Sequence, residues 1–275
     1  MAADNDRNDL VRAFVEEVES RRTADMSFRD DPKLPALPTC GVGSGKSRYL
    51  LLAAAIDATT ASTGIRPLLA DLDRRMCGLG YARGLLDISL DHNQIVLDVI
   101  TTRQRRGELG GWQIKAQVPR ILAEANAFVD YDANGDFDAW ARQFDSPRPI
   151  VDKLAKGIWY QGRPRSEARK KMWMLLRWLV RPAPDLRLWD HLDPADLMVP
   201  VDAHVARFAA RLGVIEGHRA KEPFWREVEA ITAYARTLFP NDPSAGINRH
   251  EEGDERALHR RSSEPRWPRT MRRCL

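Results

Sequence analysis

An all-α fold is the class that the sequence predicts. From residue 48 onward, apolar side chains recur at the 3.6-residue period of amphipathic helices, and clusters of Gly, Pro or Asp separate the segments. No stretch alternates Val or Ile with polar residues, which is the pattern of a half-buried strand. The expected helices cover residues 48–62, 66–77, 91–106, 117–130, 136–143, 148–156, 166–181, 202–212 and 222–238.

Composition divides the chain into three parts. Residues 1–38 combine an amphipathic helix that starts at Asp9 with an extended linker, because residues 30–38 hold three prolines. Residues 39–240 carry the remaining helices and form the all-α domain. Residues 241–275 contain eight arginines and six acids with almost no periodic apolar residues. We expect this Arg-rich tail to be disordered.

Several protein classes are excluded by composition. A chain of 275 residues with 43% hydrophobic residues can bury a core, but its mean hydropathy is -0.46. No apolar run approaches the ~20 residues of a membrane span. The N-terminus lacks the apolar core of a secretory signal, and three scattered cysteines are too few for a disulfide framework or a four-cysteine cluster. We expect a cytoplasmic, nucleoid-associated protein that needs no membrane, metal or cofactor.

Residues 41–47 are similar to the second half of a phosphate-binding loop. Gly45-Lys46-Ser47 leads into an apolar helix, but Cys40 stands where that motif has its first glycine, and residues 35–38 replace the buried strand. We expect a glycine turn that caps the next helix and whose free N–H groups can bind an anion. A P-loop nucleotide-binding protein is kept as an alternative.

Basic residues are concentrated in one internal segment, where seven of them face a single acid between Arg163 and Arg181. The same segment places Met172, Leu175 and Leu179 on one side of a helix. A further helix is expected after Asp202, which is a good N-cap residue.

Residues 166–181, SEARKKMWMLLRWLVR, and 200–213, PVDAHVARFAARLG, together resemble the helix-hairpin-helix DNA glycosylases of the endonuclease III superfamily. The resemblance covers roughly residues 152–242. It is closest to an uncharacterised bacterial family that is similar to the archaeal 8-oxoguanine DNA glycosylases. It implies a helix-hairpin-helix fold and a monomer that acts on double-stranded DNA containing a damaged base, with oxidised guanine favoured.

The resemblance implies that Lys170 is a Schiff-base nucleophile and that Asp202, thirty-two positions later, is the assisting carboxylate of a glycosylase and AP lyase. Like charges beside Lys170 favour its neutral form. Lys171 is the competing nucleophile, about 100° away on the helix. The alternative interpretations are that Lys170 only forms part of a solvent-exposed helix face and that Asp202 only caps a helix.

Further contacts are expected around this pair. Trp173 and His204 are candidates for the base pocket, although core packing and a structural role suit them better. Gln104 is the candidate wedge that fills the space of an extruded base. The expected DNA contacts are Arg163, Arg165, Arg169, Lys171, Arg177, Gln104 and Arg105.

The sequence departs from the superfamily at residues 157–163, which hold two glycines without the spacing of its DNA-gripping hairpin. A second hypothesis is therefore a catalytically silent or repurposed glycosylase fold that binds DNA or takes part in base modification. That hypothesis predicts DNA binding without a covalent intermediate.

Overall fold

The computed structural model of the protein describes residues 8–13, 16, 45–57, 64–109, 115–158, 168–182, 185–217 and 225–245. These residues form helices and connecting turns and contain no strand, which confirms the all-α class. None of the described helices is both long and apolar enough to span a membrane. Cys77, near the end of the second of these helices, is disulfide-bonded.

The helical elements follow the expected order, with short 3-10 and π turns added between them. They are α2 (Lys46–Ile56), α3 (Ile65–Gly78), η2 (Gly84–Asp87), η3 (Leu90–His92), α4 (Asn93–Arg105), α5 (Val118–Ala127), the π-helical η4 (Phe128–Asp132), α6 (Phe137–Ala141), α7 (Pro147–Gly157), α8 (Lys170–Val180), η6 (Pro194–Asp196), α9 (Ala203–Arg211) and α10 (Trp225–Leu238).

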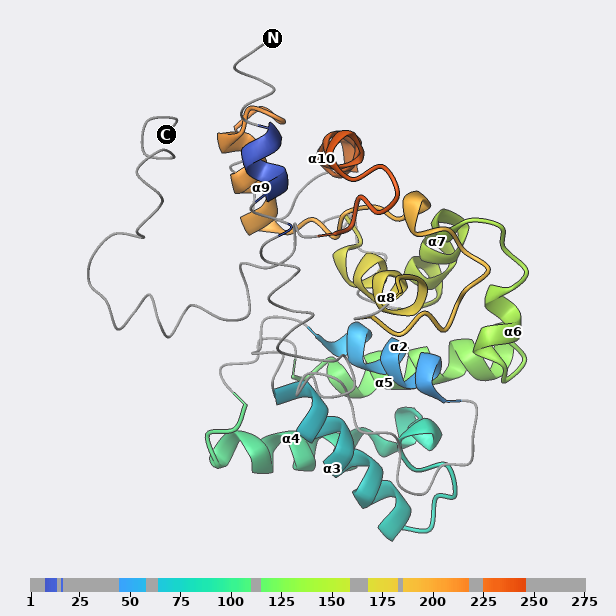
Figure 1. The fold of residues 1–275 in the computed structure, drawn as a ribbon. Helices are drawn as coiled ribbons and strands as arrows, with labels where there is room; N and C mark the ends of the chain where they lie inside the picture. Colours follow the sequence, from blue (N-terminus) through green and yellow to red (C-terminus); the bar gives the residue numbers. More distant parts are fainter. Residues whose placement is uncertain are drawn as a thin grey trace.

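The helices lie in successive tiers (Figure 1). Helices α3 and α4 form one side of the molecule, α2 and α5 cross its middle, and α7 and α8 lie beyond them. Helices α9 and α10 follow at the far end from α3. Residues 8–13 also form a helical segment, whose Val11 packs against Leu238 of α10.

Helix α2 is the centre of this arrangement. Every side chain from Ser47 to Ile56 is buried, and the helix contacts α3, α5, α6 and α8. The apolar run of the sequence explains this position, because a helix that is hydrophobic on all sides has to be surrounded. Its three consecutive alanines, Ala53 to Ala55, add little bulk between the neighbouring helices.

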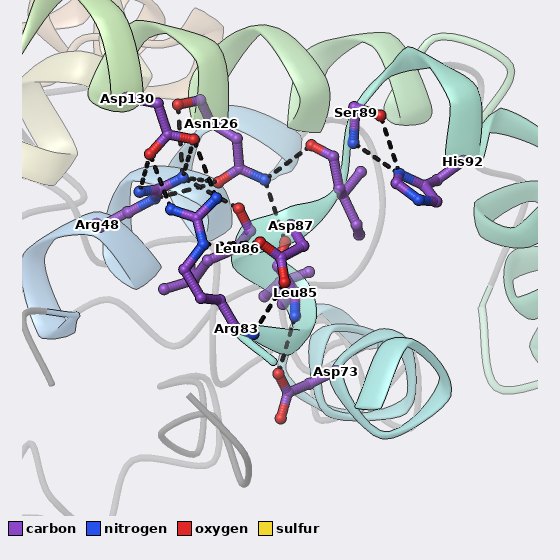
Figure 2. A network of polar contacts seen from close by, with 11 residues as sticks. Arg48, Asp73, Arg83, Leu85, Leu86, Asp87, Ser89, His92, Asn126 and Asp130 are labelled. Carbon is purple, nitrogen blue, oxygen red and sulfur yellow. Dashed lines mark hydrogen bonds and ion pairs between the residues drawn. The ribbon is translucent and has the colours of Figure 1, made fainter. Parts of the chain in front are cut away.

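One charged residue of α2, Arg48, is buried together with this apolar surface. Its guanidinium donates to Asn126 Oδ1 at 3.0 Å, to Asp130 Oδ1 at 2.7 Å and to the carbonyl of Leu86 at 3.1 Å. Figure 2 shows that Asp130 also accepts a hydrogen bond from Arg83, whose Nη1 lies 3.1 Å from Asp130 Oδ1. Burial alone would raise the pKa of Asp130, but hydrogen bonds from the two arginines outweigh it and lower that pKa. The network joins α2 to η2, α5 and η4.

Several boundaries differ from those that the sequence predicts; α2, for example, covers Lys46–Ile56 where residues 48–62 were expected. Helix α8 begins at Lys170 instead of residue 166, because Arg169 has left-handed angles, φ 47° and ψ 35°, that a right-handed helix cannot continue through. At the other end, the expected tail starts at residue 241, yet Arg181 forms an ion pair with Asp242, and Ser244 is buried. The rest of the tail lies outside the described residues.

We predict that Arg48→Met lowers the free energy of unfolding by about 3–5 kcal/mol, because it leaves buried polar partners without their donor. Arg83→Met, which removes the half-exposed arginine of the same network, should cost at most about 1 kcal/mol. Urea denaturation of both variants tests this difference. Equal losses would show that burial of Arg48 does not control the stability of the network.

Candidate amine and carboxylate site

Lys170 is the first residue of α8 and lies at the edge of the core. The apolar face of this helix, including Met172, Leu175 and Leu176, is fully buried. These contacts fix the position of the helix, whereas the Lys170 side chain at its first turn keeps 25% of its surface exposed. The backbone of Lys170 is thus fixed by the helix, and its side chain is partly exposed.

Asp202 brings a carboxylate to that amine. Its Oδ2 atom lies 2.8 Å from Lys170 Nζ, and its Oδ1 atom accepts the backbone N–H groups of His204 at 2.9 Å and Val205 at 2.8 Å. Asp202 therefore caps α9 and binds Lys170 at the same time. From the sequence, capping and binding of Lys170 are alternative roles for Asp202, but a carboxylate has two oxygens and can serve both. The side chain is 15% exposed, so the contact is only partly shielded from water.

Lys171 points into the protein. Its Nζ atom is buried, and burial together with the like charge of Lys170 lowers the pKa of Lys171 to about 7, against the opposing effect of the Asp57 carboxylate. The two adjacent lysines thus lie in different environments, as their separation around the helix predicts. The buried Nζ atom of Lys171 does not support the DNA contact expected there. Lys170 is the lysine that faces Asp202.

The other DNA contacts predicted in this segment differ in how deeply they are buried. Arg169 forms an ion pair with Asp152 and keeps part of its side chain exposed. Arg177 is buried, with Nε 3.7 Å from Asp185 Oδ2, and is therefore an interior charge and not a phosphate contact. Arg163 and Arg165 lie outside the described residues.

Neither candidate for the base pocket is confirmed. Trp173 is fully buried among the core residues, and its Nε1 atom is enclosed with no hydrogen-bond partner in the described part of the chain. Core packing is therefore the role that its position supports. His204 is exposed on the first turn of α9, where its Nδ1 atom lies 3.1 Å from Arg207 Nη2.

The predicted wedge is not next to Lys170. Gln104 and Arg105 form the end of α4, and Gln104 accepts a hydrogen bond from Lys115 Nζ at 3.3 Å. In Figure 1, α2 and α5 separate α4 from α8. The structure therefore does not bring the wedge candidate together with the amine and the carboxylate.

The glycine segment is only partly described. Gly45 precedes α2, Lys46 is its exposed first residue and Ser47 is buried, whereas residues 41–44 lie outside the described part. No strand precedes α2 among the residues that are described. Within the described ranges, no group of three or more His, Cys, Asp and Glu side chains is arranged to hold a metal ion.

One cluster beside the site was not predicted. Arg148 and Asp152 on α7 lie 3.3 Å apart, Asp152 also binds Arg169, and the guanidinium carbon of Arg148 lies 3.8 Å above the Trp225 ring. The i,i+4 spacing of Arg148 and Asp152 is visible in the sequence and is common on helices. Only the fold shows that the pair meets the residue before Lys170.

Comparison with known proteins changes the interpretation of the family. Residues 134–245 match a family of proteins of unknown function, DUF2400. No curated protein and no solved structure matches the chain. No glycosylase family was detected, so the assignment to the helix-hairpin-helix DNA glycosylases is contradicted. The residues behind that assignment define one helix start and one capped helix, which is a local arrangement and does not specify a superfamily.

The buried amine of Lys171 makes stability depend on pH. Its folded pKa of about 7 lies below the value of 10.5 for an ordinary lysine, so the unfolded chain binds more protons between these values. The contribution of Lys171 to stability therefore becomes more favourable as pH rises from about 7 to 10. We predict that the free energy of unfolding of Lys171→Met minus that of the wild type decreases across this range. Urea denaturation at several pH values measures it.

The matched control for this experiment is Lys156→Met, which removes an exposed amine of α7. The slope with pH is the quantity to compare, because loss of other contacts of Lys171 adds an offset that does not vary with pH. The same slope in both variants would contradict the burial of a titrating amine at residue 171.

Proposed function

We propose that the protein is a DNA glycosylase with AP lyase activity, in which Lys170 is the nucleophile and Asp202 is the assisting carboxylate. The observation that carries the proposal is the 2.8 Å contact between Lys170 Nζ and Asp202 Oδ2 at the capped start of α9. An amine held against a carboxylate, with both partly exposed, is suited to attack an electrophilic sugar carbon. The proposal depends on this chemistry and not on membership of a glycosylase family.

The first step breaks the bond between base and sugar. Asp202 accepts a proton from the ammonium group of Lys170, and the neutral amine attacks C1′ of the deoxyribose. The glycosidic bond breaks and its electron pair leaves with the base, which takes up a proton from solvent. The carboxylate stabilises the positive charge that develops on the sugar, because it is already oriented by the N–H groups of His204 and Val205.

The second step cleaves the DNA strand. Opening of the sugar ring gives a protonated Schiff base between Lys170 Nζ and C1′, which makes the C2′ proton more acidic. Loss of that proton expels the phosphate at C3′ by β-elimination. Water then hydrolyses the Schiff base and releases Lys170 as the free amine. Removal of the C2′ proton by a base that is already placed beside the sugar is general base catalysis.

The exposed face of α9 supports DNA as the partner. His204, Arg207 and Arg211 are exposed on this helix, which carries no acidic residue between Ala203 and Arg211. The two arginines are four residues apart, so they are neighbours on one face, about 6 Å apart along the axis. No ion pair involves Arg207 or Arg211 within the described part of the chain. Cations beside Asp202 suit a phosphate backbone that passes the site.

No residue in the described ranges selects a particular base. Oxidised guanine is expected only through the resemblance that the comparisons contradict. The substrate class in this proposal is therefore duplex DNA that contains a damaged base or an abasic site.

We predict that borohydride traps a covalent adduct between the wild-type protein and duplex DNA containing an abasic site, and that Lys170→Gln abolishes it. Asp202→Asn should lower the rate of adduct formation about 10²–10³-fold, because it removes the negative charge at the reacting centre. Asparagine caps a helix as well as aspartate does, so this change leaves α9 capped.

Lys156→Gln, on the exposed side of α7, is the matched control and should form the adduct at the wild-type rate. An adduct that persists in Lys170→Gln would assign the nucleophile elsewhere. DNA binding by the wild type without any adduct, on abasic, uracil or 8-oxoguanine duplexes, would instead favour a silent or base-modifying protein.

The basic face of α9 gives a prediction for the salt dependence of binding. Replacing Arg207 and Arg211 together by Ala should reduce the slope of log K against log salt by about 2, because each lost phosphate contact accounts for about one unit. Fluorescence anisotropy with a labelled duplex at several salt concentrations measures the slope. Arg75→Ala, on α3 at the opposite end of the molecule, is the control (Figure 1). An equal change in the control would exclude a specific role for α9.

A further inference from the structure

The residue before Lys170 has an unusual backbone conformation. Arg169 lies in the left-handed region, with φ 47° and ψ 35°, although it is not a glycine. A residue with a Cβ atom adopts this conformation only when its surroundings hold it there. Its carbonyl oxygen accepts the N–H groups of Met172 at 3.0 Å and Trp173 at 3.1 Å. The conformation of Arg169 thus defines the first turn of α8, which contains Lys170.

The first turn of α8 has no side-chain cap of its own. No side chain at the N-cap accepts a hydrogen bond from the first N–H groups of this helix. An uncapped first turn frays readily, because four N–H groups at a helix start have no partner within the helix. Lys170 is the first residue of the helix, so fraying would displace it before any core residue of α8 moved.

An ion pair joins this turn to α7. Asp152 binds the guanidinium of Arg169, and Arg148 Nε lies 3.3 Å from the same carboxylate. Arg148 in turn stacks on Trp225 at the start of α10, 3.8 Å from the ring centroid. Asp152 is therefore fixed between two cations. Burial and the like charge of Arg148 lower the pKa of Arg169.

We infer that Asp152 and Arg169 are a positioning pair, which stabilises the left-handed turn and thereby keeps Lys170 Nζ against Asp202. This inference rests on the proposed function, because it assigns to the pair the positioning of that nucleophile. Neither residue takes part in the chemical steps. The pair acts by keeping the first turn of α8 formed, and misplacement of a reacting group by about 1 Å can lower a rate about 10²-fold.

The test begins with Asp152→Asn, which removes the negative charge of the pair. We expect kcat for cleavage of abasic DNA to fall about 10-fold or more while KM changes less than twofold, since the pair orients the nucleophile. Adding Arg169→Gly should restore most of the lost rate, because glycine adopts left-handed angles without a bound side chain. Glu124→Gln removes an i,i+4 ion pair on α5 and is the control. Failure of glycine to rescue the rate would overturn the inference.

A second measurement needs no DNA activity. Acetylation by an amine-reactive ester, located by mass spectrometry, reports how exposed and how nucleophilic Lys170 is. We expect Asp152→Asn to label severalfold faster at Lys170 than the wild type, with Lys156 of the same chain as the internal reference. Equal labelling of Lys170 in both proteins would overturn the positioning role. If the wild type forms no adduct with DNA, the proposed function fails, and the labelling result alone decides whether the turn is held by this pair.

Discussion

The burial of Arg48 is the constraint around which the fold is organised. Helix α2 is apolar on all sides and has to be enclosed, yet its third residue carries a permanent charge. A charge taken from water needs partners with suitable geometry, and Asn126, Asp130 and the Leu86 carbonyl supply them. These partners come from η2, α5 and η4. Enclosing α2 therefore requires those elements to lie in one arrangement around it (Figure 2).

The position of α2 also determines where the residues of the candidate site lie. Helix α8 packs on α2, and this contact turns one face of α8 inward. Lys171, one residue further along, is consequently buried near Asp57 at the end of α2, and Lys170 remains at the edge of the core. Two neighbouring lysines thereby acquire different chemistry. The amine of Lys171 is buried and has a lowered pKa, whereas Lys170 has an ion-pair partner and a partly exposed side chain.

Much of the helical layout could be predicted from the sequence, because the apolar period of each segment is a local property. The apolar run after Ser47 indicated the buried helix, and the spacing of Met172, Leu175 and Leu179 indicated the buried face of α8. The start of α8 could not be predicted in the same way. Residues 166–181 have one continuous helical pattern, but Arg169 has left-handed angles and forms an ion pair with Asp152, a residue of another helix. Family membership was also not decided by local motifs, and the matched family has no assigned function.

The sequence by itself determined the all-α class, the order of the helices and the N-cap position of Asp202, since each follows from residues close together in the chain. Only the tertiary structure decided which lysine meets Asp202, that Arg177 and Trp173 belong to the interior, and that Gln104 lies away from the site. The reason is physical. Burial and the pairing of charges depend on which helices pack together, and that packing joins residues that are far apart in sequence.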